Sequence, residues 1–253
     1  MNIRSSFLVL ALAVTAVACA PAKNNFPPAG YDTTAPTLPD DPSKEGADPA
    51  LNRDAEADKI SADRFDTPNL TTNQKSQVLA KYNFVDQKKV IRTSILENAI
   101  VYYDANKSRT KNSAYLTVLD FSLPSNKQRL HVINMKTGTV WSLHVAHGKG
   151  SDANHDAYAE KFSNTSGSNA SSLGAYLTAE TYSGGKGYSL RLDGLSTTNS
   201  QARGRAIVIH GASYVQDANV KQGRSWGCPA VSMANRTKLI DMIKGGSIIF
   251  AAN

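Results

Sequence analysis

Two stretches of the chain organise the rest of the sequence around them: Ala206-Ile207-Val208-Ile209-His210-Gly211 and Ser225-Trp226-Gly227-Cys228-Pro229-Ala230. The first is an apolar run that predicts a β-strand ending at His210. Cys228 is the only cysteine beyond the first twenty residues, so it has no disulfide partner in the part that we expect to fold. An imidazole can take the proton of a thiol and so produce the nucleophilic thiolate. We therefore interpret Cys228 as a nucleophile and His210 as its base, rather than Cys228 as a buried small hydrophobe.

These residues resemble the catalytic motif of the L,D-transpeptidase (YkuD-type) family, in which a histidine precedes a Ser/Thr-His-Gly-Cys box by fourteen to seventeen residues. Fourteen residues, 211–224, separate His210 from Ser225 in this chain. Trp226 replaces the box histidine, and Pro-Ala follows the cysteine, as in the murein L,D-transpeptidase branch with a Ser-x-Gly-Cys-Pro-Ala box. The resemblance runs from about Ala114 to the C-terminus. It includes the blocks 147–151, 161–164, 171–174 and 187–192.

The resemblance implies a reaction on peptidoglycan, with stem peptides as donor and acceptor. Cys228 would attack the carbonyl carbon of the third residue of a tetrapeptide stem, and the terminal D-Ala would leave. An amine of a second stem would then attack the thioester and form a 3→3 cross-link. His210 would transfer the protons, and the carbonyl of Gly211 would hold its imidazole in one tautomer. The backbone amides of Gly227 and Cys228 would form the oxyanion hole.

Five residues near this motif are candidates for substrate binding: Ser225, Trp226, Arg224, His147 and Lys149. An indole has no titratable group, so Trp226 can only pack, donate its N–H or stack on a sugar, and we favour packing against the cysteine loop. Arg224 and Lys149 carry charges that suit a stem carboxylate, although Arg224 could also brace the loop. For His147, a place in the substrate cleft and a polar position at a strand end stay equally open.

The first nineteen residues predict export. Arg4 precedes an apolar run over 7–18, which has the length of a signal peptide and is too short to span a membrane. Residues 16–19 can be a lipobox, with cleavage before Cys19 and a lipid on its thiol, or an A-x-A site for ordinary signal peptidase. We favour a lipoprotein of the periplasm or cell envelope. The outer membrane is its expected location, because Ala20 rather than aspartate follows Cys19.

Residues 20–72 are rich in Pro and Asp and predict a disordered tether. Residues 1–73 hold six Lys/Arg and ten Asp/Glu, whereas residues 74–253 hold twenty-two and eleven. Such a positive surplus attracts polyanions. Nucleic acid is a poor candidate for an exported chain without a basic helix. We therefore expect cell-wall peptides and anionic envelope polymers as partners, and no nucleic acid.

Residues 73–110 predict a helical prelude, with apolar side chains at helical spacing around Val78 and Ile95. Residues 111–253 predict a mainly β catalytic domain. Its strands are expected over 115–121, 129–134, 139–146, 175–179, 188–192, 206–210 and 247–251. One helix is expected to begin at Ser232. The predicted fold class is a mixed sheet or β-sandwich with a short N-terminal helical module and one or two small helices, as the resemblance also implies.

We expect a monomer that needs no cofactor and no metal. His155 lies between Asp152 and Asp156, but this spacing fits no familiar set of metal ligands. Two alternatives to transpeptidation stay open. Water could resolve the same acyl-enzyme, which would make the chain an L,D-carboxypeptidase, or the chain could be a non-catalytic wall-binding lipoprotein. The intact pair of His210 and Cys228 argues against the second alternative.

Overall fold

The computed structural model describes residues 65–253. The predicted signal peptide, the lipidation site at Cys19 and the tether up to residue 64 lie outside the described residues. Within the described range, no helix is both long and apolar enough to cross a membrane.

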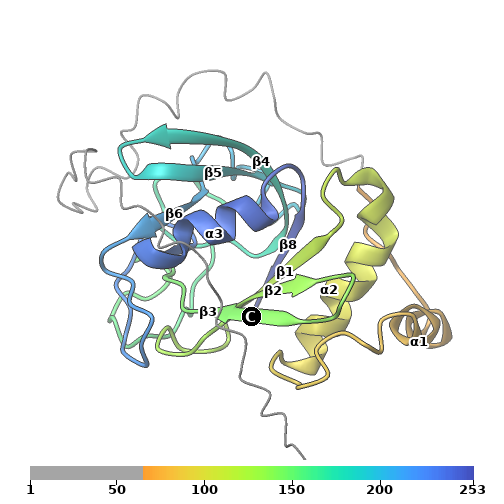
Figure 1. The fold of residues 1–253 in the computed structure, drawn as a ribbon. Helices are drawn as coiled ribbons and strands as arrows, with labels where there is room; N and C mark the ends of the chain where they lie inside the picture. Colours follow the sequence, from red (N-terminus) through yellow and green to blue (C-terminus); the bar gives the residue numbers. More distant parts are fainter. Residues whose placement is uncertain (1–64) are drawn as a thin grey trace, which may run out of the picture. The chain divides into compact units, whose positions relative to one another are not determined.

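An eight-stranded mixed sheet forms the framework of the described part (Figure 1). Its strands are β1 (Tyr115–Asp120), β2 (Leu130–Asn134), β3 (Val140–Leu143), β4 (Gly174–Gly184), β5 (Gly187–Gly194), β6 (Val208–Ala212), β7 (Ala230–Ser232) and β8 (Ile248–Ala252). Their order across the sheet is β3-β2-β1-β8-β4-β5-β6-β7. The pairs β1–β8 and β6–β7 are parallel, and the other neighbours are antiparallel. The predicted mainly β fold class is confirmed.

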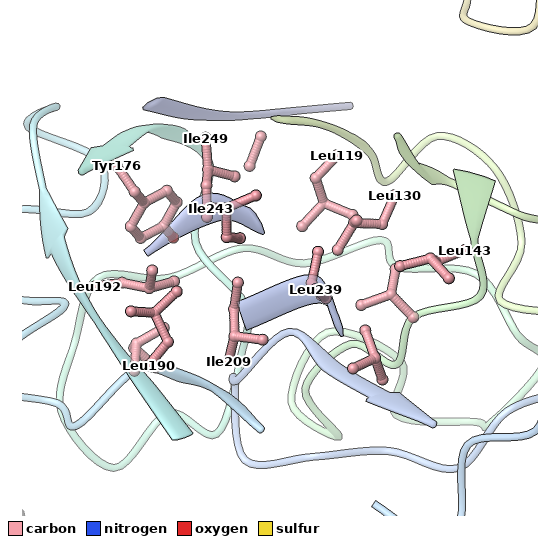
Figure 2. Packing of buried hydrophobic residues seen from close by; sticks show 14 of the residues in the cluster. Leu119, Leu130, Leu143, Tyr176, Leu190, Leu192, Ile209, Leu239, Ile243 and Ile249 are labelled. Carbon is pink, nitrogen blue, oxygen red and sulfur yellow. The ribbon is translucent and has the colours of Figure 1, made fainter. Parts of the chain in front are cut away.

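The helix α3 (Met233–Ile243) covers one face of this sheet. Ser232 caps its first turn, since the Ser232 side chain accepts a hydrogen bond from the Asn235 backbone N–H, as the sequence predicted. Leu239 and Ile243 point from the helix into an apolar core that the strands complete (Figure 2). Ile240 belongs to the same core. The other labelled members of this core are Leu119, Leu130, Leu143, Tyr176, Leu190, Leu192, Ile209 and Ile249.

The helices α1 (Thr72–Ala80) and α2 (Thr93–Asn106) build a second core with β1 and β8, and the short 3-10 helix η4 (Lys107–Arg109) follows α2. Strand β1 explains how one sheet serves both cores. Leu116 and Val118 belong to the α2 core, whereas Leu119 belongs to the α3 core. Successive side chains of a strand point to opposite faces, so a strand that is buried on both sides, such as β1, carries apolar residues on both faces.

The structure corrects three of the expected strands and adds one. β6 spans Val208–Ala212 and so continues past His210, where the strand over 206–210 was expected to end. β3 ends at Leu143 rather than at residue 146, because the chain there turns away and the Ala146 N–H donates to the carbonyl of Ala230 at 2.8 Å. β4 is longer than expected because it continues past an irregularity between Thr178 and Thr181 into a hairpin with β5. β7 was not among the expected strands. Its three residues pair with β6, which brings the cysteine segment to the edge of the sheet.

Leu239→Ala is expected to lower the free energy of unfolding by about 2–5 kcal/mol, because it removes buried methyl groups and leaves a cavity beneath the sheet. Leu239 is fully buried, with 0% of its surface exposed. Urea unfolding followed by circular dichroism measures the change. Val90→Ala is the control: Val90 is 51% exposed, and its loss should change the free energy of unfolding by no more than about 0.5 kcal/mol. Equal losses in the two variants would contradict the packing described here.

Candidate active site

His210 projects from β6 on the face opposite the α3 core. Ile207 and Ile209 belong to that core, and side chains alternate along a strand, so Val208 and His210 share the other face. His210 is buried, and its Nδ1 lies 3.0 Å from the carbonyl oxygen of Gly211.

This contact fixes the tautomer of the neutral imidazole. A carbonyl oxygen can only accept a hydrogen bond, so Nδ1 carries the proton and Nε2 presents a lone pair. The hydrogen bond to the Gly211 carbonyl that the sequence predicted is present. Gly211 itself is packed tightly, since a Cβ built there would lie 2.8 Å from the Met233 sulfur of α3. The strand that carries His210 therefore fixes the orientation of its ring, with the Nε2 lone pair able to accept a proton.

Cys228 lies just before β7, on the same face as His210. His210 is the register partner of Ala230 in the parallel pair β6–β7. Cys228 comes two positions before Ala230. Its side chain clusters with Val208, which is two positions from His210 on β6. The thiol lies 3.7 Å from the carbonyl oxygen of Ala206 and is 6% exposed. The structure thus brings the predicted nucleophile and the predicted base onto one face of two adjacent strands.

Ser225 shapes the cysteine loop from within. Its hydroxyl donates to the carbonyl of Cys228 at 2.7 Å and accepts from the N–H of Gly227 at 3.1 Å. Its backbone N–H donates to the carbonyl of His147 at 2.9 Å, and its carbonyl accepts from the N–H of Lys149 at 2.8 Å. Ser225 has no exposed surface. Both hydrogen bonds of the Ser225 hydroxyl close the loop, which gives Ser225 a structural role here, and the predicted substrate contact stays a prediction.

Gly227 occupies a place that no other residue fits. Its φ of +119° lies in the left-handed region that disfavours side chains. A Cβ built there would also lie 2.8 Å from the carbonyl oxygen of Ala170. In this structure its N–H donates to the Ser225 hydroxyl. The oxyanion-hole roles of the Gly227 and Cys228 amides stay predictions, and the Cys228 amide is the one that we use below.

Ser171 joins the loop to a distant segment. Its hydroxyl donates to the carbonyl of Gly227 at 3.3 Å and accepts from the N–H of Gly148 at 3.0 Å. Gly148 and Ser225 form an isolated parallel bridge next to this contact. The block 171–174, which is part of the family resemblance, thus supplies the side chain that holds Gly227, the residue before the cysteine.

His147 lies beneath the loop and is only 1% exposed. Nδ1 lies 2.8 Å from a guanidinium nitrogen of Arg129, and Nε2 lies 3.0 Å from a carboxylate oxygen of Asp152. Because an arginine can only donate, Nδ1 accepts and the Nε2 proton goes to the carboxylate. Burial, followed by the charge of Arg129, lowers the pKa of His147 to about 4. His147 is therefore a neutral bracing residue, and the substrate contact considered for it is not supported.

Lys149 and Trp226 lie together at the surface of the site. The Lys149 ammonium is 4.7 Å from the centroid of the Trp226 ring, which is a cation–π arrangement. Lys149 is exposed and Trp226 is half-buried. Arg224 is also half-buried, and its guanidinium donates to the backbone carbonyls of Asp152 and Ala153. Two of the predicted substrate-binding residues thus form one surface, whereas Arg224 braces the loop.

The site also contains residues that the sequence analysis missed: Arg129, Asp152, Ser171 and Arg205. The Asp152 carboxylate binds the His147 ring and the N–H groups of Asp156 and Ala157, so it is part of the bracing network. In residues 65–253, no group of three His, Cys, Asp or Glu side chains is arranged to hold a metal ion. One sequence feature could have indicated a charged turn beside the site: two arginines flank a glycine shortly before β6, in Arg203-Gly204-Arg205.

The pairing of a strand histidine with a cysteine in a glycine-rich loop agrees with a comparison against known families. Residues 87–252, more than half of the chain, match the L,D-transpeptidase catalytic domain. The chain belongs to this family. The match begins at residue 87, within the range 73–110 that was predicted as a helical prelude.

Solved structures similar to this L,D-transpeptidase domain include an L,D-transpeptidase from Mycobacterium smegmatis, with 15% identity and a TM-score of 0.36 over 55% of this chain and 59% of the other. L,D-transpeptidase 1 of Mycobacterium tuberculosis gives 14% identity and a TM-score of 0.32 over 55% and 62%. The helical cell shape determining protein Pgp2 of Campylobacter jejuni gives 12% identity and a TM-score of 0.36, over 55% of this chain and 47% of the other. The chain thus spans less than two thirds of these proteins. No curated protein matches the chain.

The free energy of unfolding of the L,D-transpeptidase domain is expected to fall as the pH is lowered from about 6.5 to 4. The folded pKa of His147 is about 4, below the unfolded value of about 6.5, so the unfolded chain binds more protons in this window. The contribution of His147 is fully present above pH 6.5, and its loss amounts to at most about 3 kcal/mol. Urea unfolding at a series of pH values measures it.

His147→Asn is the matched variant for this profile. It should lower the free energy of unfolding at pH 7. It should also make this free energy depend less on pH between 6.5 and 4, because the imidazole whose pKa differs between the folded and unfolded chains is gone. Parallel profiles for the variant and the wild type would show that His147 is not the group responsible.

Proposed function

We propose that this chain is an exported peptidoglycan L,D-transpeptidase that forms 3→3 cross-links through a thioester on Cys228. The observation that carries the proposal is the placement of Cys228 and His210 on one face of the β6–β7 pair, with His210 Nδ1 held by the Gly211 carbonyl. The family match supports the reaction class. The apolar leader over 7–18 supports export, and a lipid on Cys19 would attach the chain to the envelope membrane.

The first half-reaction is acylation. His210 Nε2 takes the proton of the Cys228 thiol, and the sulfur attacks the carbonyl carbon of the third stem residue. The carbonyl oxygen becomes an oxyanion, for which the amide of Cys228 is the proposed donor. The tetrahedral intermediate collapses by breaking the bond to D-Ala, whose nitrogen receives the proton from His210. The products are free D-Ala and a thioester.

The second half-reaction transfers the acyl group. The amine of an acceptor stem attacks the thioester carbon and gives its proton to His210. The carbon–sulfur bond then breaks, and Cys228 regains its proton from His210. One amide is broken and one is formed, so no outside energy source is needed. Water in place of the amine would release a tripeptide, which is the carboxypeptidase outcome.

The experiment is mass spectrometry of purified disaccharide-tetrapeptide incubated with the protein. The expected product is a dimer whose mass equals two donor molecules less one D-Ala, because the acceptor amine replaces D-Ala. Cys228→Ala should abolish it, and His210→Gln should lower kcat by about 10²–10⁴-fold at pH 7.

The controls separate the alternatives. Circular dichroism must show that both variants are folded. Tripeptide without dimer would make the chain a carboxypeptidase. If folded wild-type protein gives neither product nor a covalent adduct, the proposal that the chain is an enzyme is overturned, and a wall-binding lipoprotein is favoured.

Trp226→Phe is expected to raise KM roughly tenfold with little change in kcat, because the indole and Lys149 form the exposed surface beside the cysteine. Trp141→Phe is the matched control. Trp141 also has a lysine over its ring, Lys238 at 4.2 Å, but it packs against the α3 core.

The same control variant provides a direct binding measurement. These are the only two tryptophans of the chain, so Trp141→Phe leaves Trp226 as the only indole. Its fluorescence should change on titration with disaccharide-tetrapeptide. An unchanged KM in Trp226→Phe together with unchanged fluorescence would restrict Trp226 to packing.

A further inference from the structure

Arg205 lies directly behind the cysteine loop, in the turn that precedes β6. Its two terminal nitrogens donate to the carbonyls of Ser163 and Ala170, both at 2.6 Å. A Cβ built on Gly227, the residue before Cys228, would lie 3.2 Å from Nη2 of Arg205. The next residue, Ala206, supplies the carbonyl that the Cys228 thiol contacts. The guanidinium is therefore fixed next to the reactive segment.

The charge of Arg205 is not neutralised by a carboxylate. Its remaining bonds go to the hydroxyls of Ser172 and Ser168, so all its hydrogen-bond acceptors in the described part of the chain are neutral oxygens. Arg203, two residues earlier, differs completely. It donates to both Glu180 oxygens at 2.9 and 3.0 Å and to Asp193 at 2.5 Å. A half-buried cation without an anion is costly, which indicates that an anion forms nearby.

Two acidic groups act on Arg205: Tyr176 and Cys228. Burial lowers the pKa of Arg205, and the negative charge that either group would carry raises it again. Burial also raises the pKa of Tyr176 to about 12, so its phenol stays neutral at physiological pH. Of the two groups, only Cys228 would therefore supply an anion to Arg205 near neutral pH, as its thiolate. The other charged or titratable groups near the thiol are His210 on β6, Tyr182 on β4, and Arg191 on β5, which is paired with Glu180 and lies over the Tyr182 ring.

We infer that Arg205 is the fixed counter-charge of the Cys228 thiolate, and that it holds the thiolate ready before substrate binds. The inference rests on the proposed role of Cys228 as the nucleophile. A cation beside a cysteine favours the thiolate because the attraction acts only on the charged form. The two groups then divide the work: His210 transfers the proton, and Arg205 stabilises the charge that remains on sulfur. Arg205 is a positioning residue in this sense, since it bonds no part of the substrate in this scheme.

The test is the pH profile of alkylation of Cys228 by iodoacetamide, a neutral reagent that reacts with the thiolate. The full chain carries Cys19→Ser, so that Cys228 is the only thiol. In Arg205→Gln and in Arg205→Met, the midpoint of the profile should rise by about one pH unit, and the rate below both midpoints should fall about tenfold. Arg205→Lys keeps the charge and should stay close to the wild-type midpoint.

Arg203→Lys is the matched control, because it perturbs the same turn and keeps its charge. It should lower the melting temperature without moving the midpoint. An unchanged midpoint in both neutral variants would overturn the inference. So would an Arg205→Lys profile shifted as far as that of Arg205→Gln, since this would assign Arg205 to holding the 163–170 segment.

Alkylation needs no peptidoglycan, so this outcome is independent of the test of transpeptidation. A low midpoint that depends on the charge at position 205, in a chain that makes no cross-link, would keep the inference and remove the transpeptidase function. A chain that makes cross-links but whose midpoint does not depend on the charge at position 205 would keep the transpeptidase function and remove the inference.

Discussion

Three backbone segments approach one another without a side chain between them, and the geometry around the cysteine depends on this approach. A Cβ built on Gly148 would lie 2.9 Å from the Cα of Gly227, and one built on Gly227 would lie 2.8 Å from the Ala170 carbonyl. A side chain at either glycine would separate the segments and break the bridge that Ser171 makes between them. The glycine of the cysteine box is therefore required by packing on its rear side as well as by access to the nucleophile.

Two hydrogen-bond networks that contain charged side chains support this contact. Arg129, His147 and Asp152 form one chain of hydrogen bonds, and Arg203 with Glu180 and Asp193 forms another. Removing one partner from such a network leaves an uncompensated charge, so each network favours a single arrangement of its backbone. The first network lies under the segment that bonds to Ser225, and the second anchors the turn before β6. Together they fix both stretches that carry the reactive side chains.

Much of this could be predicted from the sequence because the signals are local. Alternating apolar residues identified most strands, and the spacing of His210 and Cys228 identified the family. The roles of His147 and Gly227 could not be predicted, because they depend on partners far along the chain. Arg129 bonds His147 from eighteen positions away, and Ser171 bonds Gly227 from fifty-six. Whether a polar residue beside a glycine is exposed or covered is decided by such partners and leaves no local pattern.

β7 has a consequence for how the molecule opens. It lies at the outer edge of the sheet, where, among the described residues, β6 is its only neighbouring strand and a single backbone bond, from the Ala146 N–H to the Ala230 carbonyl, reaches it from another segment, whereas β1, β8 and β4 each have a strand on both sides. Edge strands have the least cooperative support, so their amides exchange with solvent through small local fluctuations. The bonds from Ser225 to His147 and Lys149 take the place of the missing neighbour. The cysteine segment can therefore unfold locally while the central strands stay paired.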